Sequence, residues 1–521
     1  MRRSLNAALH ARAATHVDPA AGPQRARRRV AALRDTLGVD LGAGPGGQLG
    51  DQPRVVVVGG GFAGLSAALI LRMYGCQVAL YEATARLGGR VWSQPAANAR
   101  ERLVEWGAEL IGFNHAMWLW LAEAFELGFA MQTGEDAWDR LGLTLPVDLL
   151  GQVVPDGDDV WTAMDAAFQT LNDATTLVPD PYAPWAAPNA AALDAQSLSQ
   201  WKARLQLPPR VDAAVEVDFA CNNTRPTALQ SYLGVLAQVS GGGGAAFWTD
   251  TEVMRCATGN QSLAAAMSRW LVDRGVVLSV GTPVVGVSWN GSTMATRLAG
   301  GSTVTSDYVV LATPQPVWSS ITFSPALPSG LQVQTGPAVK FLTTLDRRVW
   351  LRSRLAPMAL SDVVGETWEG TDNQTMQAGE HAVLSVFAGA HQAEAALSRG
   401  PDPSAWYADR LKLLYPGYVE SRAGTSFLAW PNQPFVGCGY SCPAPNQVTT
   451  AVQALSRPAA TLGGRLVFAG EHVSPCFFGY MEGALESGLH AAEVILGGAG
   501  LRPADSVDAA LRAAAQAGRA T

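Results

Sequence analysis

The chain has 521 residues, of which 48% are hydrophobic and 16% are charged, and its net charge is −7. The charged share lies below the roughly 25% usual for soluble domains, which excludes a disordered chain and predicts a large buried core. No global basic field is present to bind nucleic acid or an anionic membrane. The six cysteines include no C-x-x-C pair, which argues against a disulfide scaffold and a zinc site, and we predict no metal ligands.

Residues 1–53 form a basic N-terminal arm with eight arginines and neither lysine nor glutamate. We expect a short helix over residues 22–37 and a glycine-rich linker over 40–52. Two adjacent arginines at positions 2 and 3 suggest a twin-arginine signal, but polar residues interrupt the apolar stretch that must follow, so we predict a cytoplasmic protein. The arm is either a solvated surface segment or, alternatively, a pro-segment or subunit-binding arm, and a homodimer is one expectation.

The segment after the arm predicts a βαβ unit. Residues 54–58, Arg-Val-Val-Val-Val, are typical of a buried parallel strand, and a helix over 62–74 and a strand over 77–82 follow. The 17 uncharged residues from Val55 to Leu71 reach only the lower limit for a membrane helix. A glycine turn within them argues against a span, so we predict no transmembrane segment.

Further elements follow in chain order. Helical patterns lie near 114–128, 159–172, 194–206, 226–239 and 261–274, and strands are predicted near 276–289, 294–298 and 303–312. A tryptophan-rich mixed region spans about 337–430. A strand at 465–469, a helix at 480–497 and a short alanine-rich helix complete the chain, and no internal repeat of fixed period is visible.

The segment from Gly59 to Gly64 has the pattern G-x-G-x-x-G directly after a predicted strand. Gly59 allows a tight turn, Gly61 lets a pyrophosphate approach the backbone, and the last glycine lets the helix pack closely. The free N–H groups of the helix face the pyrophosphate, and Glu82, which ends the second strand, can accept hydrogen bonds from a ribose. The alternative is a glycine turn in a cofactor-free fold. The dinucleotide-binding residues predicted here are Gly59, Gly61, Phe62, Ala63, Gly64, Glu82 and Ala83.

Two further segments carry a resemblance to a known family. Leu87-Gly88-Gly89-Arg90 offers a second close approach to a phosphate, and Phe468 to His472 precedes a glycine-rich helix start at Gly479. With these segments the chain resembles the flavin-containing amine oxidase family, of the monoamine oxidase and L-amino acid oxidase type, over about residues 54–498. The resemblance implies bound FAD and adds these cofactor residues: Gly88, Gly89, Arg90, Val284, Glu471, Gly479, Tyr480 and Met481.

The resemblance also implies an α/β fold with two domains. A Rossmann-like FAD-binding domain is expected from residues 54–110, 255–335 and 425–498, and a mixed α+β substrate domain from 111–254 and 336–424, with a C-terminal tail at 499–521. Some family members attach the flavin to a cysteine just before an aromatic residue. That position is Gly439 here, with Cys438 one residue earlier, so we expect noncovalent FAD.

Three side chains match catalytic positions of the family. Lys340 resembles the lysine that holds a water near flavin N5 and assists the reaction with O2. Tyr440 and Tyr480 resemble the aromatic pair that guides an amine toward the flavin, since ring faces attract positive charge. The alternatives are a surface lysine that extends its amine to water and two tyrosines of the core.

The substrate class stays open at this stage. An amino acid oxidase needs an arginine for the substrate carboxylate, and the segment 105–115 contains none. Arg255 is one substitute, while Glu109 either binds a cationic substrate end or forms an ordinary salt bridge. The expected reaction turns an L-amino acid or primary amine, O2 and water into a carbonyl, ammonia and hydrogen peroxide through an imine. Alternatives are a flavin desaturase or porphyrinogen-type oxidase, a non-catalytic flavin-binding module and, more weakly, an NAD dehydrogenase.

Overall fold

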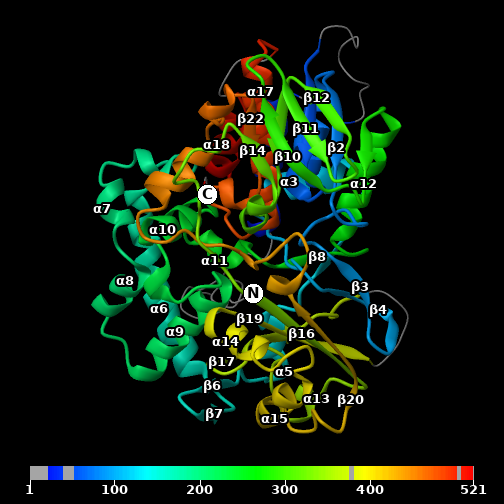
Figure 1. Cartoon of the computed structure of the whole chain (residues 1–521). Coiled ribbons are helices and arrows are strands. Elements are labelled where there is room, and N and C mark those ends of the chain that lie inside the picture. Colours follow the sequence, from blue (N-terminus) through cyan, green and yellow to red (C-terminus); the bar gives the residue numbers. More distant parts are fainter. Residues whose placement is uncertain (1–20, 39–40, 42–51, 375–380, 502–505, 520–521) are drawn as a thin grey trace.

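The computed structural model describes residues 21–38, 41, 52–374, 381–501 and 506–519. A parallel sheet and a mixed sheet lie in different halves of the molecule, the first in the upper half of Figure 1 and the second in the lower half. The linker predicted at 40–52 lies almost wholly outside the described residues. No helix within the described ranges is both long and apolar enough to cross a membrane.

The first sheet has five parallel strands. Its central strand carries the valine run after Arg54, which is buried on both faces, as is typical of parallel sheets. Val55 and Val57 face one hydrophobic cluster, while Val56 and Val58 face another. The strand order is β22 (Leu466–Phe468), β13 (Tyr308–Leu311), β1 (Arg54–Val58), β2 (Gln77–Tyr81) and β9 (Val277–Ser279). The helices of the first cluster include α3 (Phe62–Met73), α12 (Gln261–Asp273) and α17 (Met481–Gly498).

A four-stranded sheet contributes to the cluster on the other face of the parallel sheet. Its order is β12 (Thr303–Ser306), β11 (Met294–Leu298), β10 (Val284–Trp289) and β14 (Thr322–Ser324). The single strands predicted near 276–289 and 303–312 are therefore wrong, since each splits into two strands of different sheets. The chain turns at Gly281, whose φ is +61°, and again at Asp307, whose carboxylate accepts hydrogen bonds from Arg54.

The second large sheet has seven strands, mostly antiparallel. All eight residues of its strand β16 (Ala338–Leu345) are buried. The order is β20 (Arg422–Ala429), β16, β19 (Ala382–Gly389), β18 (Gly365–Glu369), β17 (Ala359–Ser361), β6 (Val147–Leu149) and β7 (Gln152–Val154). Helices α6 (Asp158–Ala174), α8 (Leu198–Arg204), α9 (Pro209–Asn222) and α10 (Tyr232–Gly241) supply one adjoining core.

Smaller elements complete the described chain. Three two-stranded sheets pair β3 (Ser93–Ala96) with β4 (Ala99–Glu105), β5 (Phe129–Met131) with β8 (Met254–Cys256), and β15 (Thr335–Gly336) with β21 (Tyr440–Ser441). Apart from the two helices near the chain ends, the other described α-helices are α4 (Ala116–Ala124), α5 (Glu135–Leu141), α7 (Ala190–Asp194), α11 (Ala246–Asp250), α13 (Val349–Arg352), α14 (Ala390–Leu397), α15 (Ser404–Leu414) and α16 (Gln453–Leu455).

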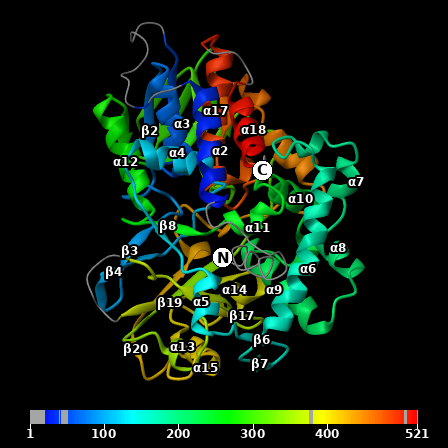
Figure 2. The same cartoon turned by 180° about the vertical axis from the view of Figure 1, so that it is seen from behind.

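The helix expected in the N-terminal arm is present as α2 (Ala21–Leu37), but it is not a solvated segment. It packs beside the C-terminal helix α18 (Ser506–Arg519) and against α4, as Figure 2 shows. Arg25 donates two hydrogen bonds to Asp250, at 2.7 and 2.6 Å. Arg29 is buried and donates to the carbonyl of Gly242 at 3.1 Å. The two terminal helices therefore cover one face of the molecule together.

Candidate active site

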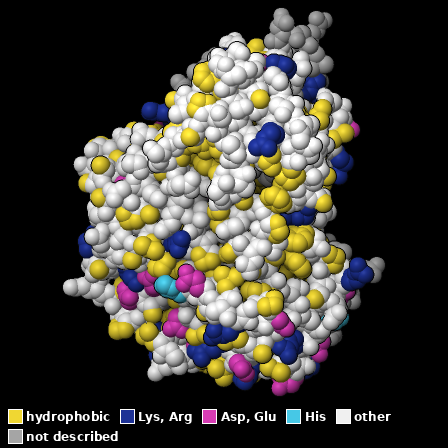
Figure 3. Space-filling model, viewed as in Figure 1, with side chains coloured by type: hydrophobic (Ala, Val, Ile, Leu, Met, Phe, Trp, Pro, Cys, Tyr) yellow, Lys and Arg dark blue, Asp and Glu magenta, His cyan; other side chains and the backbone are white. Residues whose placement is uncertain are grey.

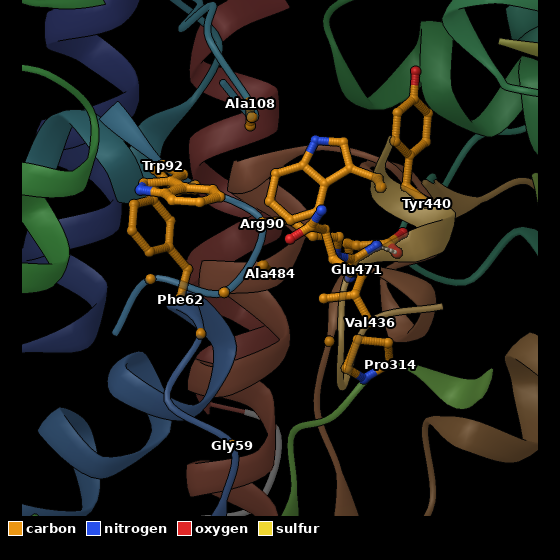
Figure 4. Close-up of a pocket in the computed structure, with 18 of the residues that line it drawn as sticks. Gly59, Phe62, Arg90, Trp92, Ala108, Pro314, Val436, Tyr440, Glu471 and Ala484 are labelled. Atoms are coloured by element: carbon orange, nitrogen blue, oxygen red, sulfur yellow. Dashed lines mark hydrogen bonds and ion pairs between the residues drawn. The ribbon is translucent and has the colours of Figure 1, made fainter. Parts of the chain in front are cut away.

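A cavity of about 620 Å³ lies where segments of the parallel sheet meet segments of the seven-stranded sheet. On the surface, hydrophobic side chains gather around a hollow between the two halves (Figure 3). Inside, Phe62 and Trp92 stand on one side of the cavity and Tyr440 on the other (Figure 4). The cavity is thus built from residues near both ends of the chain.

The structure brings nearly all of the predicted site residues to this cavity. Gly64 is the exception, because it packs beneath the turn, where an added Cβ would lie 2.0 Å from the carbonyl oxygen of Gly59. The predicted residues that line the cavity are Gly59, Gly61, Phe62, Ala63, Glu82, Ala83, Gly88, Gly89, Arg90, Glu109, Val284, Lys340, Tyr440, Glu471, Gly479, Tyr480 and Met481.

The glycine turn leaves room for a ligand. Gly61 precedes the first residue of α3, and the nearest atom to a Cβ added there is the Cα of Gly89, at 3.8 Å. Glu82 is fixed beside the turn, since its Oε2 accepts a hydrogen bond from the N–H of Gly60 at 2.7 Å and its Oε1 accepts one from Thr84 at 2.8 Å. The free N–H end of α3 and a fixed carboxylate fit the pyrophosphate and ribose of a dinucleotide.

Glu471 joins three separate segments of the cavity wall. It accepts hydrogen bonds from Arg90 Nη1 at 2.8 Å, from the backbone N–H of Gly479 at 2.7 Å and from the hydroxyl of Ser441. Burial would raise the pKa of Glu471, but Arg90, His472 and the hydrogen bonds from Ser441 and Gly479 together hold that pKa below its ordinary value. The neighbouring His472 is neutral at physiological pH, because burial lowers its pKa to about 4.

Lys340 is not a surface lysine. Its side chain is 4% exposed, and its Nζ donates to the carboxylate of Glu109 and to the carbonyl oxygen of Gly107, the latter at 3.2 Å. It also lies 5.3 Å from the ring centre of Trp368. The position of Lys340 on β16 directs its amine into the cavity, beside the segment that follows β4.

Glu109 forms salt bridges within the protein, which is the second of the two roles expected for it; the first was binding a cationic substrate end. Besides Lys340, its Oε1 accepts hydrogen bonds from Arg255 Nε and Trp368 Nε1, both at 2.8 Å. Burial alone would raise the pKa of Glu109, but Lys340 and Arg255 hold it below its ordinary value. Arg255 also donates to Asp372 and lies outside the cavity lining, so it is not placed to hold a substrate carboxylate.

The two tyrosines stand close together on one wall. Gly479, which precedes Tyr480, lies against the ring of Tyr440, because a Cβ added there would meet that ring at 2.7 Å. The hydroxyl of Tyr440 donates to the carbonyl oxygen of Asn222 at 3.0 Å, and its ring is parallel to that of Phe387, at 6.4 Å between centroids. Tyr480 immediately precedes α17. Both residues line the cavity, and the ring of Tyr480 packs edge-on against those of His115 and Phe477.

Several lining residues are absent from the sequence-based predictions. Most of them are aromatic, and two are polar; they are Trp92, Trp106, Trp368, Phe387, Trp430, Asn222 and Glu366. They come from six separate stretches of the chain, and the high tryptophan content was a signal for the four tryptophans alone. Another acid, Glu105, lies near this wall, where burial raises its pKa to about 7.

Neither a covalent link nor a metal centre is indicated at the site. Cys438 is 5% exposed and is not among the lining residues, whereas its neighbour Gly439 is. Burial raises the pKa of the Cys438 thiol to about 11. Within the part of the chain that the structure describes, no group of histidine, cysteine, aspartate and glutamate side chains is arranged to hold a metal ion.

Comparisons with known proteins agree with this geometry. The sequence model of the family described as flavin containing amine oxidoreductase matches residues 62–496. Amine oxidase [flavin-containing] B of Canis lupus familiaris is 24% identical over 87% of this chain and 88% of its own, and an L-amino acid dehydrogenase of Synechocystis sp. is 22% identical over 85% and 94%. The structure of a putrescine oxidase double mutant has a TM-score of 0.75 at 21% identity, covering 85% of this chain and 99% of its own, and shows the shared fold.

Proposed function

Because this chain belongs to the flavin-containing amine oxidoreductase family, we propose that it is an oxidase that converts a primary amine or L-amino acid to a carbonyl. The chain is a flavin-dependent oxidoreductase, and its cofactor is FAD. The proposed reaction consumes O2 and water and releases ammonia and hydrogen peroxide. Bound FAD supplies the electron acceptor for the hydride that leaves the carbon next to nitrogen.

We assign the parallel-sheet part of the chain, residues 54–110, 255–335 and 425–498, to a Rossmann-like FAD-binding domain. The glycine turn would hold the pyrophosphate, Glu82 the ribose, and Val284 the adenine side. Arg90 would offer charge for the phosphates, and the start of α17 lines the same cavity, where the positive end of the helix dipole would favour a negative group. Residues 111–254 and 336–424 would then form the substrate domain.

Protein side chains would orient the amine and exclude water. Tyr440 and Tyr480 present ring faces that attract a partly positive nitrogen. Lys340 is held in a fixed position by Glu109 and Gly107, and we propose that its ammonium orients a water molecule and supplies positive charge for the reaction with O2. The tryptophans and Phe387 of the wall keep bulk water out, which strengthens these electrostatic interactions.

The FAD is proposed to be noncovalent. The thiol of Cys438 is protonated at neutral pH, because burial raises its pKa, and it does not line the cavity. A protonated and shielded thiol is a poor nucleophile. The expectations of a homodimer and of a cytoplasmic location stay predictions.

One observation carries the proposal: Arg90 and Glu471, from opposite ends of the chain, meet in a cavity that Lys340, Tyr440 and Tyr480 also line. The family match favours amine oxidation over a desaturase, a porphyrinogen-type oxidase or a non-catalytic module. An NAD dehydrogenase would leave the C-terminal segment without a role.

The test uses purified protein. We expect a flavin absorbance that bleaches without oxygen when a suitable amine or amino acid is added, and peroxide release in air. A folded protein that binds no FAD, or bound FAD that no amine or amino acid reduces, would contradict the proposal.

A further inference from the structure

We propose that Arg25, on the N-terminal helix α2, is a positioning residue for Lys340, although Arg25 does not line the cavity. Through Asp250, Arg25 fixes the pairing of two backbone segments, and one of these segments carries Glu109, the carboxylate that holds the Lys340 ammonium. This inference rests on the role proposed for Lys340 in the reaction with O2, and it assigns a further residue to that step.

The first link is a bidentate ion pair between α2 and the end of α11. Arg25 Nε and Nη2 donate to the two carboxylate oxygens of Asp250, at 2.7 and 2.6 Å. The side chain of Asp250 is 1% exposed and that of Arg25 is 12% exposed, so water screens this pair less than a surface pair. Two hydrogen bonds between a planar guanidinium and a carboxylate fix direction as well as distance. The position of Asp250 therefore depends on α2.

The second link is backbone pairing between the segment that starts at Asp250 and the segment that precedes α4. The carbonyl oxygen of Asp250 accepts a hydrogen bond from the N–H of Phe113 at 2.7 Å. Further along, Ile111 and Met254 exchange two backbone hydrogen bonds, at 2.8 and 3.1 Å. Both segments also contribute to the cavity lining. Arg25 thus holds one end of a paired unit that forms part of the cavity wall.

The other end of this paired unit carries the groups that hold Lys340. Glu109 accepts hydrogen bonds from Lys340 and from Arg255, and Arg255 directly follows the last paired residue of its segment. Glu109 and Arg255 therefore lie at the end opposite to Asp250. A displacement of Asp250 passes along the paired backbone to Glu109 and to the ammonium that it holds. Because a shift of about 1 Å in a catalytic group can lower a rate about a hundredfold, an indirect anchor affects the rate.

A second arginine of α2 supports the same two segments. Arg29 is buried and donates to the carbonyl oxygen of Gly242 at 3.1 Å. Asn114 Nδ2 donates to the same oxygen at 3.3 Å and to the hydroxyl of Thr251 at 2.6 Å. Asn114 belongs to the first segment and Thr251 to the second. The helix α2 is therefore connected to the paired unit at two points, of which the Arg25 ion pair is the direct one.

The experiment is a double-mutant cycle on the reoxidation of bound FAD, which is first reduced by titration with dithionite and then mixed with O2. Arg25→Gln should slow reoxidation about tenfold in the otherwise wild-type holoenzyme. In the Lys340→Met background the same substitution should change the rate by less than about twofold, because the group that Arg25 positions is gone. A tenfold loss in both backgrounds, or no loss in the first, would overturn the proposal.

Two further variants of α2 sharpen the test. Arg25→Lys keeps a positive charge beside Asp250 and should slow reoxidation by less than about threefold; this variant also keeps the proposal testable if Arg25→Gln does not fold. Arg34→Gln removes an arginine of the same helix whose side chain is 50% exposed, and it should leave the rate unchanged. If Arg34→Gln slows reoxidation as much as Arg25→Gln, the effect belongs to the helix as a whole and the role of Arg25 fails.

The apoprotein gives a readout that needs neither FAD nor turnover. Arg25→Gln and Glu109→Gln together should lower the unfolding temperature by at least about 2 °C less than the sum of their separate effects, because coupled sites are not additive. Additive effects would contradict the link between Arg25 and Glu109. Dithionite replaces the amine in the first test, so a protein that no amine reduces would contradict the proposed amine oxidation and leave the positioning role of Arg25 open to both measurements.

Discussion

The guanidinium of Arg90 lies 2.8 Å from the carboxylate of Glu471, measured from Nη1 to Oε1, although 381 positions separate the two residues. The side chain of Glu471 is 7% exposed and that of Arg90 is 21% exposed. The ion pair therefore connects two segments of the cavity wall, the Gly-Gly-Arg loop and the segment before α17. It also places the guanidinium of Arg90 at the cavity, where we propose that the phosphates of the dinucleotide bind.

Replacing Glu471 by glutamine should weaken both the fold and cofactor binding. The change leaves Arg90 partly buried without its ion-pair partner, and we expect a loss of roughly 1–3 kcal/mol in the free energy of unfolding. FAD affinity should fall at least about tenfold, measured by titrating the apoprotein. The exposed pair of Asp409 and Lys412 gives the control: Asp409→Asn should change stability by less than about 0.5 kcal/mol. Equal effects of the two substitutions would contradict the role assigned to Glu471.

Two glycines of the same turn should respond differently to alanine. Gly61 has φ −75° and ψ 179°, which alanine adopts freely, and an added Cβ has space in the protein. Gly61→Ala should therefore leave the unfolding temperature of the apoprotein within about 2 °C while lowering FAD affinity at least about tenfold, because the methyl group lies where the pyrophosphate approaches. If this variant binds FAD as tightly as the wild type, the glycine turn does not contact the cofactor.

Gly64→Ala should act on the fold instead. Its added Cβ would lie 2.0 Å from the carbonyl oxygen of Gly59, so that α3 must move away from the turn. We expect an unfolding temperature lower by several degrees in the apoprotein, measured by thermal denaturation without FAD. An apoprotein as stable as the wild type would show that the helix accommodates the methyl group.

The sequence predicts the local units of the fold well, because their signals are local. The valine run of β1 is buried on both faces, and the glycines after it mark the turn into α3, so strand, turn and helix can be assigned from adjacent residues. The strands near 276–289 and 303–312 were harder. Their apolar pattern continues across the turns, and only long-range pairing decides that β9 joins β2 while β10 joins β11 and β14.

The candidate site likewise contains residues that local motifs predict and residues that only distant contacts bring together. Glycines and acids that belong to motifs were predicted by position, and all of them except Gly64 line one cavity. The partners of Glu109 were not predictable, since Arg255, Lys340 and Trp368 come from three distant elements. Glu366 and Asn222 carry no motif, and the helix that ends at Asn222 was not predicted.

Lys340→Met should slow the reaction with oxygen more than the reduction of FAD. The substitution removes the ammonium but leaves Glu109 paired with Arg255, so this buried carboxylate keeps an ion-pair partner. We expect the rate of reoxidation by O2 to fall about a hundredfold, as is typical when a positioned catalytic group is lost. Stopped-flow absorbance separates this step from anaerobic reduction by substrate.

An artificial electron acceptor provides the control for this prediction, because it bypasses O2 and should restore most of the turnover of Lys340→Met. Lys412→Met removes a lysine from the exposed face of α15 and should leave both half-reactions unchanged. If Lys340→Met impairs reduction and reoxidation equally, the lysine acts on the substrate or on the fold rather than on oxygen.

Glu482 should make stability depend on pH. Its carboxylate accepts hydrogen bonds from the backbone N–H groups of Met117 and Trp118, at 2.6 and 3.0 Å, at the start of α4. Burial raises the pKa of Glu482 from 4.5 to about 8, despite these hydrogen bonds. The protonated side chain therefore stabilises the folded state fully below the unfolded pKa, and this contribution is lost as the pH rises through the folded pKa.

Glu482→Gln keeps a neutral side chain at every pH and should remove that dependence. The unfolding temperature of the variant minus that of the wild type should be about 2–5 °C more positive near pH 8.5 than near pH 5, at constant ionic strength. Glu123→Gln removes an exposed carboxylate of α4 and gives the control, for which the difference should stay constant. If the Glu482→Gln difference is also constant across this range, the carboxylate is already ionised in the folded protein, and the N–H groups at the start of α4 bind a charge instead of a neutral acid.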